Sequence, residues 1–196
     1  MIEKKDVIAF FDRLAPGWDA DQTRSDEIIS IILDNAGVRP GADVLDVATG
    51  TGVLIPDYLA RGAASVTGID ISPNMARIAR EKFPQPQVTI LCGDAEEARF
   101  DKAFDCIVIY NAFPHFPQPR RLVEALQAHL KPGGILTIAH GSSREEIDSH
   151  HERCASGVSL GLMPAEDLAK LLAEFLDVEC VVSNDRMYQV AARKRG

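Results

Sequence analysis

Two glycines and an acidic residue in the first half of the chain have the types and spacing of a nucleoside-binding site. Gly50 and Gly52 follow the apolar run VLDVA, and Asp70 ends a second apolar run eighteen positions after Gly52. Because glycine lacks a Cβ, the backbone there can approach a ligand closely, and the free amides at the start of the next helix point at that ligand. Neighbouring parallel strands end side by side, so a carboxylate on the second strand can accept hydrogen bonds from both hydroxyls of a ribose. The pattern therefore predicts that a nucleoside binds here.

A further acidic residue, Asp46, indicates the charge of that nucleoside. It lies two residues before Ala48, in the end of the first of these strands. A carboxylate attracts an ammonium or a sulfonium and repels a pyrophosphate, which prefers an open helix N-terminus. The run from Ala48 to Ile55 also lacks the first glycine of the dinucleotide fingerprint and has isoleucine at its last position. Asp46 thus favours a cationic nucleoside over NAD.

These residues need a sheet to bring them together, and the sequence from Asp43 onwards alternates strand-like and helical segments. We expect strands at 43–48, 65–71, 88–92, 106–110 and 135–139, and helices at 53–61, 72–83, 120–130 and 164–175. The final segments, 178–182 and 188–192, flank a turn and predict a hairpin that adds an antiparallel strand. The alternation predicts the α/β class, with a mostly parallel sheet covered by helices.

The length of 196 residues fits a single domain. Helices at 3–14 and 25–36 are expected to form an N-terminal cap, and 140–163 is a polar segment without a clear period that should cover the substrate. The expected organisation is a helical cap, a cofactor-binding core, this insertion, and a last helix with the C-terminal strand pair, at 1–38, 43–139, 140–163 and 164–196.

Composition limits the partners. The formal net charge is −8, without a basic stripe, so a nucleic-acid partner is not expected. The four cysteines show no CxxC pairing, and the N-terminus has neither a signal peptide nor a run of membrane-spanning length. We therefore expect a cytosolic protein with no membrane partner, and the sequence does not indicate an oligomeric state.

Five segments, in this order and spacing, resemble the motifs of the class I S-adenosylmethionine-dependent methyltransferases: VLDVATGTG, GIDIS, CGDAEE, FDCIVIYNAFPHF and LKPGGILTIA. The N-terminal FFDRLAPGWD is also similar to a segment of quinone-biosynthesis and small-molecule methyltransferases that folds over the methionine end of the cofactor. The resemblance covers nearly the whole chain. It implies a three-layer Rossmann-like fold whose seven-stranded, mostly parallel sheet has an antiparallel last strand and an N-terminal helical cap. S-adenosylmethionine is the implied cofactor, and no metal is implied.

The resemblance also implies which positions contact the cofactor: Trp18, Asp46, Ala48, Gly50, Gly52, Asp70, Ile71, Met75, Asp94, Ala95 and Asn111. The glycine turn would hold the methionine part near Asp46, and Asp70 would bind the ribose. Ile71 and Met75 would flank the adenine, whose edge would meet Asp94 and the amide of Ala95. Asn111 would face the methionine and the acceptor.

Two of these roles have plainer alternatives. Phe11, Trp18 and Asp19 would close the site by resemblance, yet Phe11 and Trp18 could simply pack the cap onto the sheet. Asp94 could instead cap a short helix over 95–99.

Methyl transfer from a sulfonium is an in-line displacement, so the main task of the protein is to hold the acceptor in a dry pocket. A base is needed only if the acceptor is a neutral hydroxyl or an acidic carbon. The candidates are His115, then His140, with the pair His150 and His151 in the insertion. His150 and Cys154 are also spaced to meet a metal on a helix, although a polar lid helix is the more ordinary interpretation.

The predicted function is methyl transfer to a small-molecule acceptor, and no motif identifies that acceptor. One alternative is a sensor or partner subunit that binds S-adenosylmethionine without transferring the methyl group. Another is a nicotinamide-dependent reductase, which conflicts with Asp46 and the missing glycine.

Overall fold

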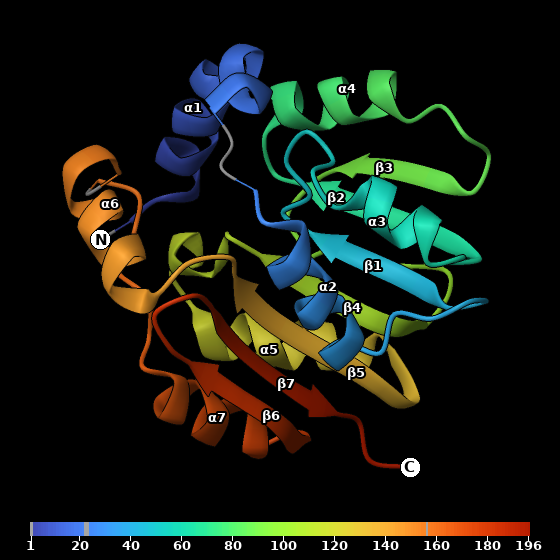
Figure 1. Ribbon diagram of the computed structural model, residues 1–196. Helices are drawn as coiled ribbons and strands as arrows, with labels where there is room; N and C mark the ends of the chain where they lie inside the picture. The colour runs from blue at the N-terminus through green and yellow to red at the C-terminus, as the bar shows by residue number, and fades with distance from the viewer. Residues whose placement is uncertain (1, 22–23, 156) are drawn as a thin grey trace.

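The computed structural model describes residues 2–21, 24–155 and 157–196. Its centre is a sheet of seven strands in the order β3-β2-β1-β4-β5-β7-β6, in which β7 alone runs antiparallel to its neighbours (Figure 1). The strands are β1 (Asp43–Val47), β2 (Ser65–Asp70), β3 (Val88–Cys92), β4 (Phe104–Tyr110), β5 (Leu130–His140), β6 (Asp177–Ser183) and β7 (Tyr188–Arg193). This confirms the expected mostly parallel sheet with an antiparallel last strand.

Helices cover both faces of the sheet and give the fold three layers. They are α1 (Lys4–Leu14), α2 (Asp26–Asn35), α3 (Ile55–Ala60), α4 (Pro73–Lys82), α5 (Pro119–Ala128), α6 (Arg144–Cys154) and α7 (Ala165–Ala173), with 3-10 turns η1 (Ala15–Asp21) and η2 (Phe113–His115). Apolar residues of α2, α3 and α4 form one core with the sheet, and those of α5 and α7 form another on the opposite face. Within the described ranges no helix is long and apolar enough to cross a bilayer.

The order of the strands places a crevice at the carboxyl ends of β1 and β4. From β1 the chain moves outward through β2 and β3, then returns to the other side of β1 as β4. The loops after β1 and β4 therefore diverge, which is where open α/β sheets bind their ligands. Helices α1 and α6 lie beyond these strand ends (Figure 1).

The two N-terminal helices do not lie together as a cap. The apolar face of α2, including Ile28 and Ile32, packs on the sheet in one core with Val44. Gln189 of β7 fixes it there by donating to the Ile32 carbonyl at 3.0 Å and accepting from the Asn35 amide at 2.9 Å. Of the two helices only α1 lines the crevice, through Lys4, Val7 and Phe11.

The segment 140–163 contains a helix, α6, that apolar periodicity does not predict. The described part of α6 has one buried residue, Ile147, so it lacks an apolar stripe. Its start carries a capping box, in which the Ser143 hydroxyl accepts from the Glu146 amide and the Glu146 side chain accepts from the Ser143 amide. The capping residues were thus the available sequence signal.

Candidate cofactor and acceptor site

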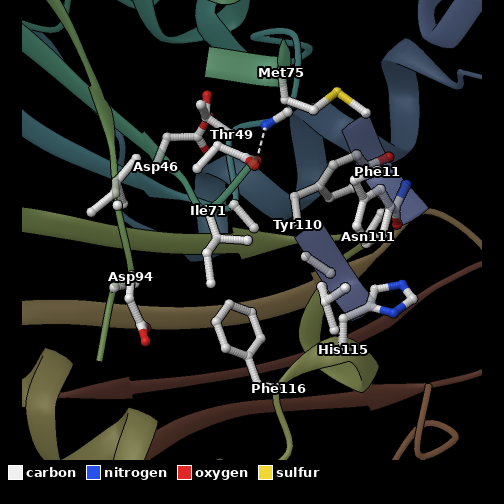
Figure 2. Close-up of a pocket in the computed structure, with 18 of the residues that line it drawn as sticks. Phe11, Asp46, Thr49, Ile71, Met75, Asp94, Tyr110, Asn111, His115 and Phe116 are labelled. Carbon is white, nitrogen blue, oxygen red and sulfur yellow. Dashed lines mark hydrogen bonds between the residues drawn. The ribbon is translucent and has the colours of Figure 1, made fainter. Parts of the chain in front are cut away.

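A cleft opens at the carboxyl ends of β1, β2 and β4, with about 1030 Å³ of empty space when its mouth is included. Most of the predicted site residues line it: Trp18, Asp46, Ala48, Gly50, Asp70, Ile71, Met75, Asp94, Ala95, Asn111 and His115. Figure 2 shows several of them, among them Asp46, Asp94 and His115, on separate elements around one space.

Gly52 and His140 do not line the cleft. A Cβ on Gly52, whose φ is +86°, would lie 2.5 Å from the Phe83 ring, so this glycine lets the turn pack against the end of α4. His140 is 2% exposed at the end of β5, opposite Tyr188 of β7. Its side chain therefore belongs to the core beside the cleft.

Asp46 is a buried acid held by two hydroxyls. Its Oδ2 accepts from the Thr49 hydroxyl at 2.5 Å and its Oδ1 from the Tyr58 hydroxyl at 3.0 Å. Burial raises the pKa of Asp46 to about 6, and the charge of Asp70 adds to the rise while the two hydroxyls oppose it. A cation in the cleft would therefore favour the ionised form of Asp46.

Asp70 joins the turns that follow β1 and β2. Its two carboxylate oxygens accept from the amides of Gly50 and Ser72, both at 2.8 Å. Burial raises its pKa to about 6, against the effect of these amides. A carboxylate offers about four lone-pair positions, so two remain for a ligand. Asp70 can therefore hold the glycine turn and accept from a diol at the same time.

The turn after β1 carries an unusual backbone conformation. Ala48 has a φ of 55°, in the left-handed region that costs a residue with a Cβ roughly 1 kcal/mol. Asn111, after β4, has a φ of 53°. Both residues line the cleft, so the strained positions of the two diverging loops face the same space, as is common at binding sites.

Asp94 is tied to its own loop and to α1. Its Oδ1 accepts from the Glu96 amide at 2.9 Å, and its Oδ2 accepts from the Lys4 ammonium, which also contacts Glu96 at 3.0 Å. Residues 95–97 form a turn and not the short helix expected over 95–99, so Asp94 caps a turn. Because Asp94 also lines the cleft, its remaining lone pairs keep the adenine role open.

Aromatic rings form the other side of the cleft. Phe11 of α1 meets Trp18 edge to face at 5.7 Å between ring centroids, and meets His115 at 4.9 Å in the same geometry. Asn111 accepts from the Gly141 amide at 3.0 Å, which joins the ends of β4 and β5. Phe11 and Trp18 thus both pack the N-terminal segment and face the cleft, so the two interpretations are compatible.

The tautomer of His115 follows from its hydrogen bond. Its Nδ1 lies 2.8 Å from the Val158 carbonyl, which can only accept, so Nδ1 carries the proton and Nε2 is left as an acceptor. Burial and, to a lesser extent, the nearby His151 at 5.0 Å between ring centroids lower the pKa of His115 to about 4 against the effect of the Val158 carbonyl. His115 is therefore neutral near pH 7.

The other histidines have different surroundings. His140 packs edge to face on Tyr188 at 6.0 Å, and its Nε2 has no hydrogen-bond partner in the described part of the chain. Burial lowers its pKa to about 3. His150 and Cys154 are exposed on α6, and the described residues contain no group of three or more His, Cys, Asp or Glu placed to hold a metal ion.

Sequence reasoning missed several residues that line the cleft: Lys4, Val7, Thr49, Tyr110 and Phe116. Lys4, Val7 and Phe11 are spaced three and four residues apart on α1, so helical periodicity could have placed them on one face. Tyr58, which supports Asp46 from behind, carries no comparable signal, because an apolar helix face accounts equally well for a tyrosine.

The sequence matches a family model described as "Methyltransferase domain" over residues 44–134. It is 32% identical over 142 residues to the malonyl-(acyl-carrier protein) O-methyltransferase of Acetivibrio thermocellus, covering 71% of this chain and 50% of the relative. It is 31% identical over 164 residues to the ubiquinone biosynthesis O-methyltransferase of Xanthomonas campestris, covering 79% and 64%. The chain thus spans about half to just under two thirds of these relatives' lengths.

The fold has a counterpart in a solved complex from Haloferax volcanii between the Trm112 methyltransferase activator and a methyltransferase. The TM-score is 0.83 at 19% identity, over 97% of this chain and 98% of the other. At this identity the likeness concerns the fold alone. The motifs in order, the cleft at the strand ends and the matched relatives support one assignment: a class I S-adenosylmethionine-dependent methyltransferase, related to those of quinone biosynthesis.

Proposed function

We propose that this protein transfers a methyl group from S-adenosylmethionine to a small-molecule acceptor. One observation carries the proposal: two buried carboxylates, Asp46 and Asp70, lie at the end of the sheet beside a strained glycine turn. Among the described residues their hydrogen-bond partners are hydroxyls and backbone amides, without a cationic side chain. A cation bound between them would relieve their mutual repulsion, whereas a pyrophosphate would add to it.

The residues of the cleft fit a cationic nucleoside along its length. The turn from Ala48 to Gly50 would hold the methionine part, with Asp46 near its ammonium, and Asp70 would accept from the ribose. Ile71 and Met75 supply apolar walls for a flat base, because both side chains line the cleft. Asp94, the amide of Ala95 and Asn111 would contact the two ends of the ligand. Gly52 and His140 do not line the cleft, so we propose that neither contacts the ligand directly.

Bound S-adenosylmethionine supplies a sulfonium methyl carbon, which an acceptor atom displaces in line. The chain's own contribution is to place the acceptor and exclude water. Phe11, Trp18 and His115 form the aromatic side on which a flat acceptor could lie. His115 would accept a hydrogen bond from the acceptor at Nε2, since its Nδ1 proton is engaged by Val158. With a pKa of about 4 it is a weak base, which favours acceptors whose own proton is acidic.

The nature of the partners is also part of the proposal. A relative named for ubiquinone biosynthesis supports a small acceptor that is methylated on oxygen. The net charge of −8 supports the absence of a nucleic-acid partner. The four cysteines are free, which supports the expected cytosolic location.

The test is to incubate the purified protein with S-adenosylmethionine carrying a labelled methyl group and a panel of phenols, catechols and carboxylates. Transfer of label to one acceptor class, with calorimetric binding of S-adenosylmethionine, is the expected result. Binding without transfer to any acceptor would favour the sensor alternative. Binding of NAD without binding of S-adenosylmethionine would overturn the proposal.

A further inference from the structure

Behind the cleft, the hydroxyl of Tyr58 donates to the acid that faces the ligand. Tyr58 belongs to α3, is fully buried, and does not line the cleft. Its hydroxyl lies 3.0 Å from Oδ1 of Asp46, while the Thr49 hydroxyl occupies Oδ2. Each oxygen of Asp46 therefore has one hydroxyl donor before any ligand arrives.

The ring of Tyr58 and its hydroxyl serve different purposes. The ring packs in an apolar core with Leu54, Ile55, Val44 and Val108, where a phenylalanine ring would fill nearly the same space. The hydroxyl is a buried polar group that needs a partner, and Asp46 is the partner found. A hydroxyl in this core adds little to packing, so the main consequence of the Tyr58 hydroxyl is the hydrogen bond that it donates to Asp46.

The groups facing Asp46 make that effect consequential. Asp70 of β2 repels its negative charge, and Tyr58 and Thr49 donate to it. Cys106 of β4 and Asp57 of α3 act on the Tyr58 hydroxyl, and each disfavours its ionisation. None of these neighbours is a cation, so the two hydroxyls are what favours the ionised carboxylate in the empty cleft.

We propose that Tyr58 is a positioning residue for cofactor binding: together with Thr49 it keeps the Asp46 carboxylate ionised, ready for the positively charged ligand. This inference rests on the proposed function. Without the Tyr58 hydroxyl, Asp46 would retain its proton to a higher pH, and the ligand would have to displace that proton in order to bind. The donated bond favours the charged form of Asp46, so its loss is felt only in the pH range where Asp46 titrates.

The test measures calorimetric affinity for S-adenosylmethionine from pH 5.5 to 8.5 in wild type, Tyr58→Phe and Tyr188→Phe. The control, Tyr188→Phe, removes the hydroxyl of another buried tyrosine, which donates to the Met163 carbonyl at 2.9 Å and not to Asp46. A hydrogen bond to a charged group is worth about one pKa unit, so Tyr58→Phe should move the midpoint up by about one pH unit and bind roughly five-fold more weakly at pH 6. At pH 8.5 the three proteins should agree within two-fold. Asp70 titrates in all three proteins, so the difference between their pH profiles reports on Asp46 alone.

A second readout is the number of protons released on binding, obtained from calorimetry in buffers of different ionisation enthalpy. At pH 6.5 Tyr58→Phe should release more protons than wild type. An unchanged pH profile, or a loss of affinity equal at pH 6 and pH 8.5, would overturn the proposal. If Tyr58→Phe does not fold, Thr49→Val and Thr49→Ser test the same claim, because only the first should reproduce the pH-dependent loss. Wild type that binds no S-adenosylmethionine at any pH would instead contradict the proposed function.

Discussion

The two sides of the cleft hold opposite kinds of titratable group in the same kind of environment. On the cofactor side, Asp46 and Asp70 end regular strands, and burial raises the pKa of each to about 6. On the acceptor side, His115 follows β4 in a short turn, and burial lowers its pKa to about 4. Both environments disfavour charge in the empty protein. A cationic ligand would reverse this for the acids and not for the histidine, so the comparison predicts where the positive charge of the cofactor lies.

The largest effect should come from Asp46→Asn. This change keeps the shape of the side chain and removes the negative charge that would meet the cofactor, so affinity for S-adenosylmethionine should fall by about 100-fold, or roughly 3 kcal/mol. Calorimetry near pH 8 gives the affinity with the wild-type acid ionised. Asp43→Asn is the matched control, because Asp43 lies at the opposite end of β1 with Lys131 and Lys102. An equal loss of affinity in both variants would contradict the assignment of the cofactor to the carboxyl end of β1.

The next effect concerns the acceptor side. His115→Gln should lower kcat by roughly 10- to 100-fold, since a glutamine amide has no basic nitrogen to take the acceptor's proton, while affinity for S-adenosylmethionine stays within about two-fold. Steady-state kinetics with the acceptor found in the labelled assay, together with calorimetry, separate the two quantities. His150→Gln changes an exposed histidine on α6 and should match wild type. A loss of cofactor affinity without a loss of kcat would place His115 on the wrong side of the cleft.

A smaller effect distinguishes the histidines from the acids by the sign of their pH dependence. The pKa of buried His140 is lowered to about 3 from an ordinary value of 6.5, so the unfolded chain binds a proton first as the pH falls. Its contribution to stability is present above about pH 6.5 and is lost as the pH falls below that value. The pKa values of Asp46 and Asp70 are raised instead, so these acids favour folding as the pH falls from about 6 to 4.

His140→Asn should therefore gain stability relative to wild type as the pH is lowered from 8 to 5, by about 2 kcal/mol between those two values. Urea unfolding at both pH values measures the change, and any constant effect of the substitution cancels in the difference. His150→Asn is the exposed control. A difference that does not depend on pH would mean that His140 is not held neutral in the folded protein.

The same comparison explains how far the sequence could predict the structure. Asp46, the glycines and Asp70 can be predicted to lie together because parallel strands bring their carboxyl ends to one edge of a sheet. The strands and the glycine turns can each be recognised from neighbouring residues in the sequence. His140 was expected near the acceptor because it ends β5. The antiparallel pairing with Tyr188 in β7, a contact distant in sequence, instead holds its ring in the core. The contact between Tyr58 and Asp46 likewise joins two elements whose packing no local pattern specifies.

The acceptor side was harder to predict for a related reason. Helix α6 has few apolar residues, so its place in the fold depends on the residues that follow it, Ala155 and Val158, which form a small core with Val7 of α1. That small core joins the N-terminal helix to the segment after α6, and neither segment has a periodic signature that predicts it. Regular strands can be predicted from their own residues, whereas loops and covering helices depend on contacts that only the folded chain provides.

The most direct test of the central claim is the affinity of Asp70→Ala for S-adenosylmethionine, measured by calorimetry against wild type. The variant loses both the bond to the Gly50 amide, which holds the turn, and the acceptors for the ribose, so binding should weaken by at least about 100-fold. Circular dichroism should show the same secondary structure in both proteins. Unchanged affinity in the folded variant would contradict the account, because the nucleoside would then bind somewhere other than the ends of β1 and β2.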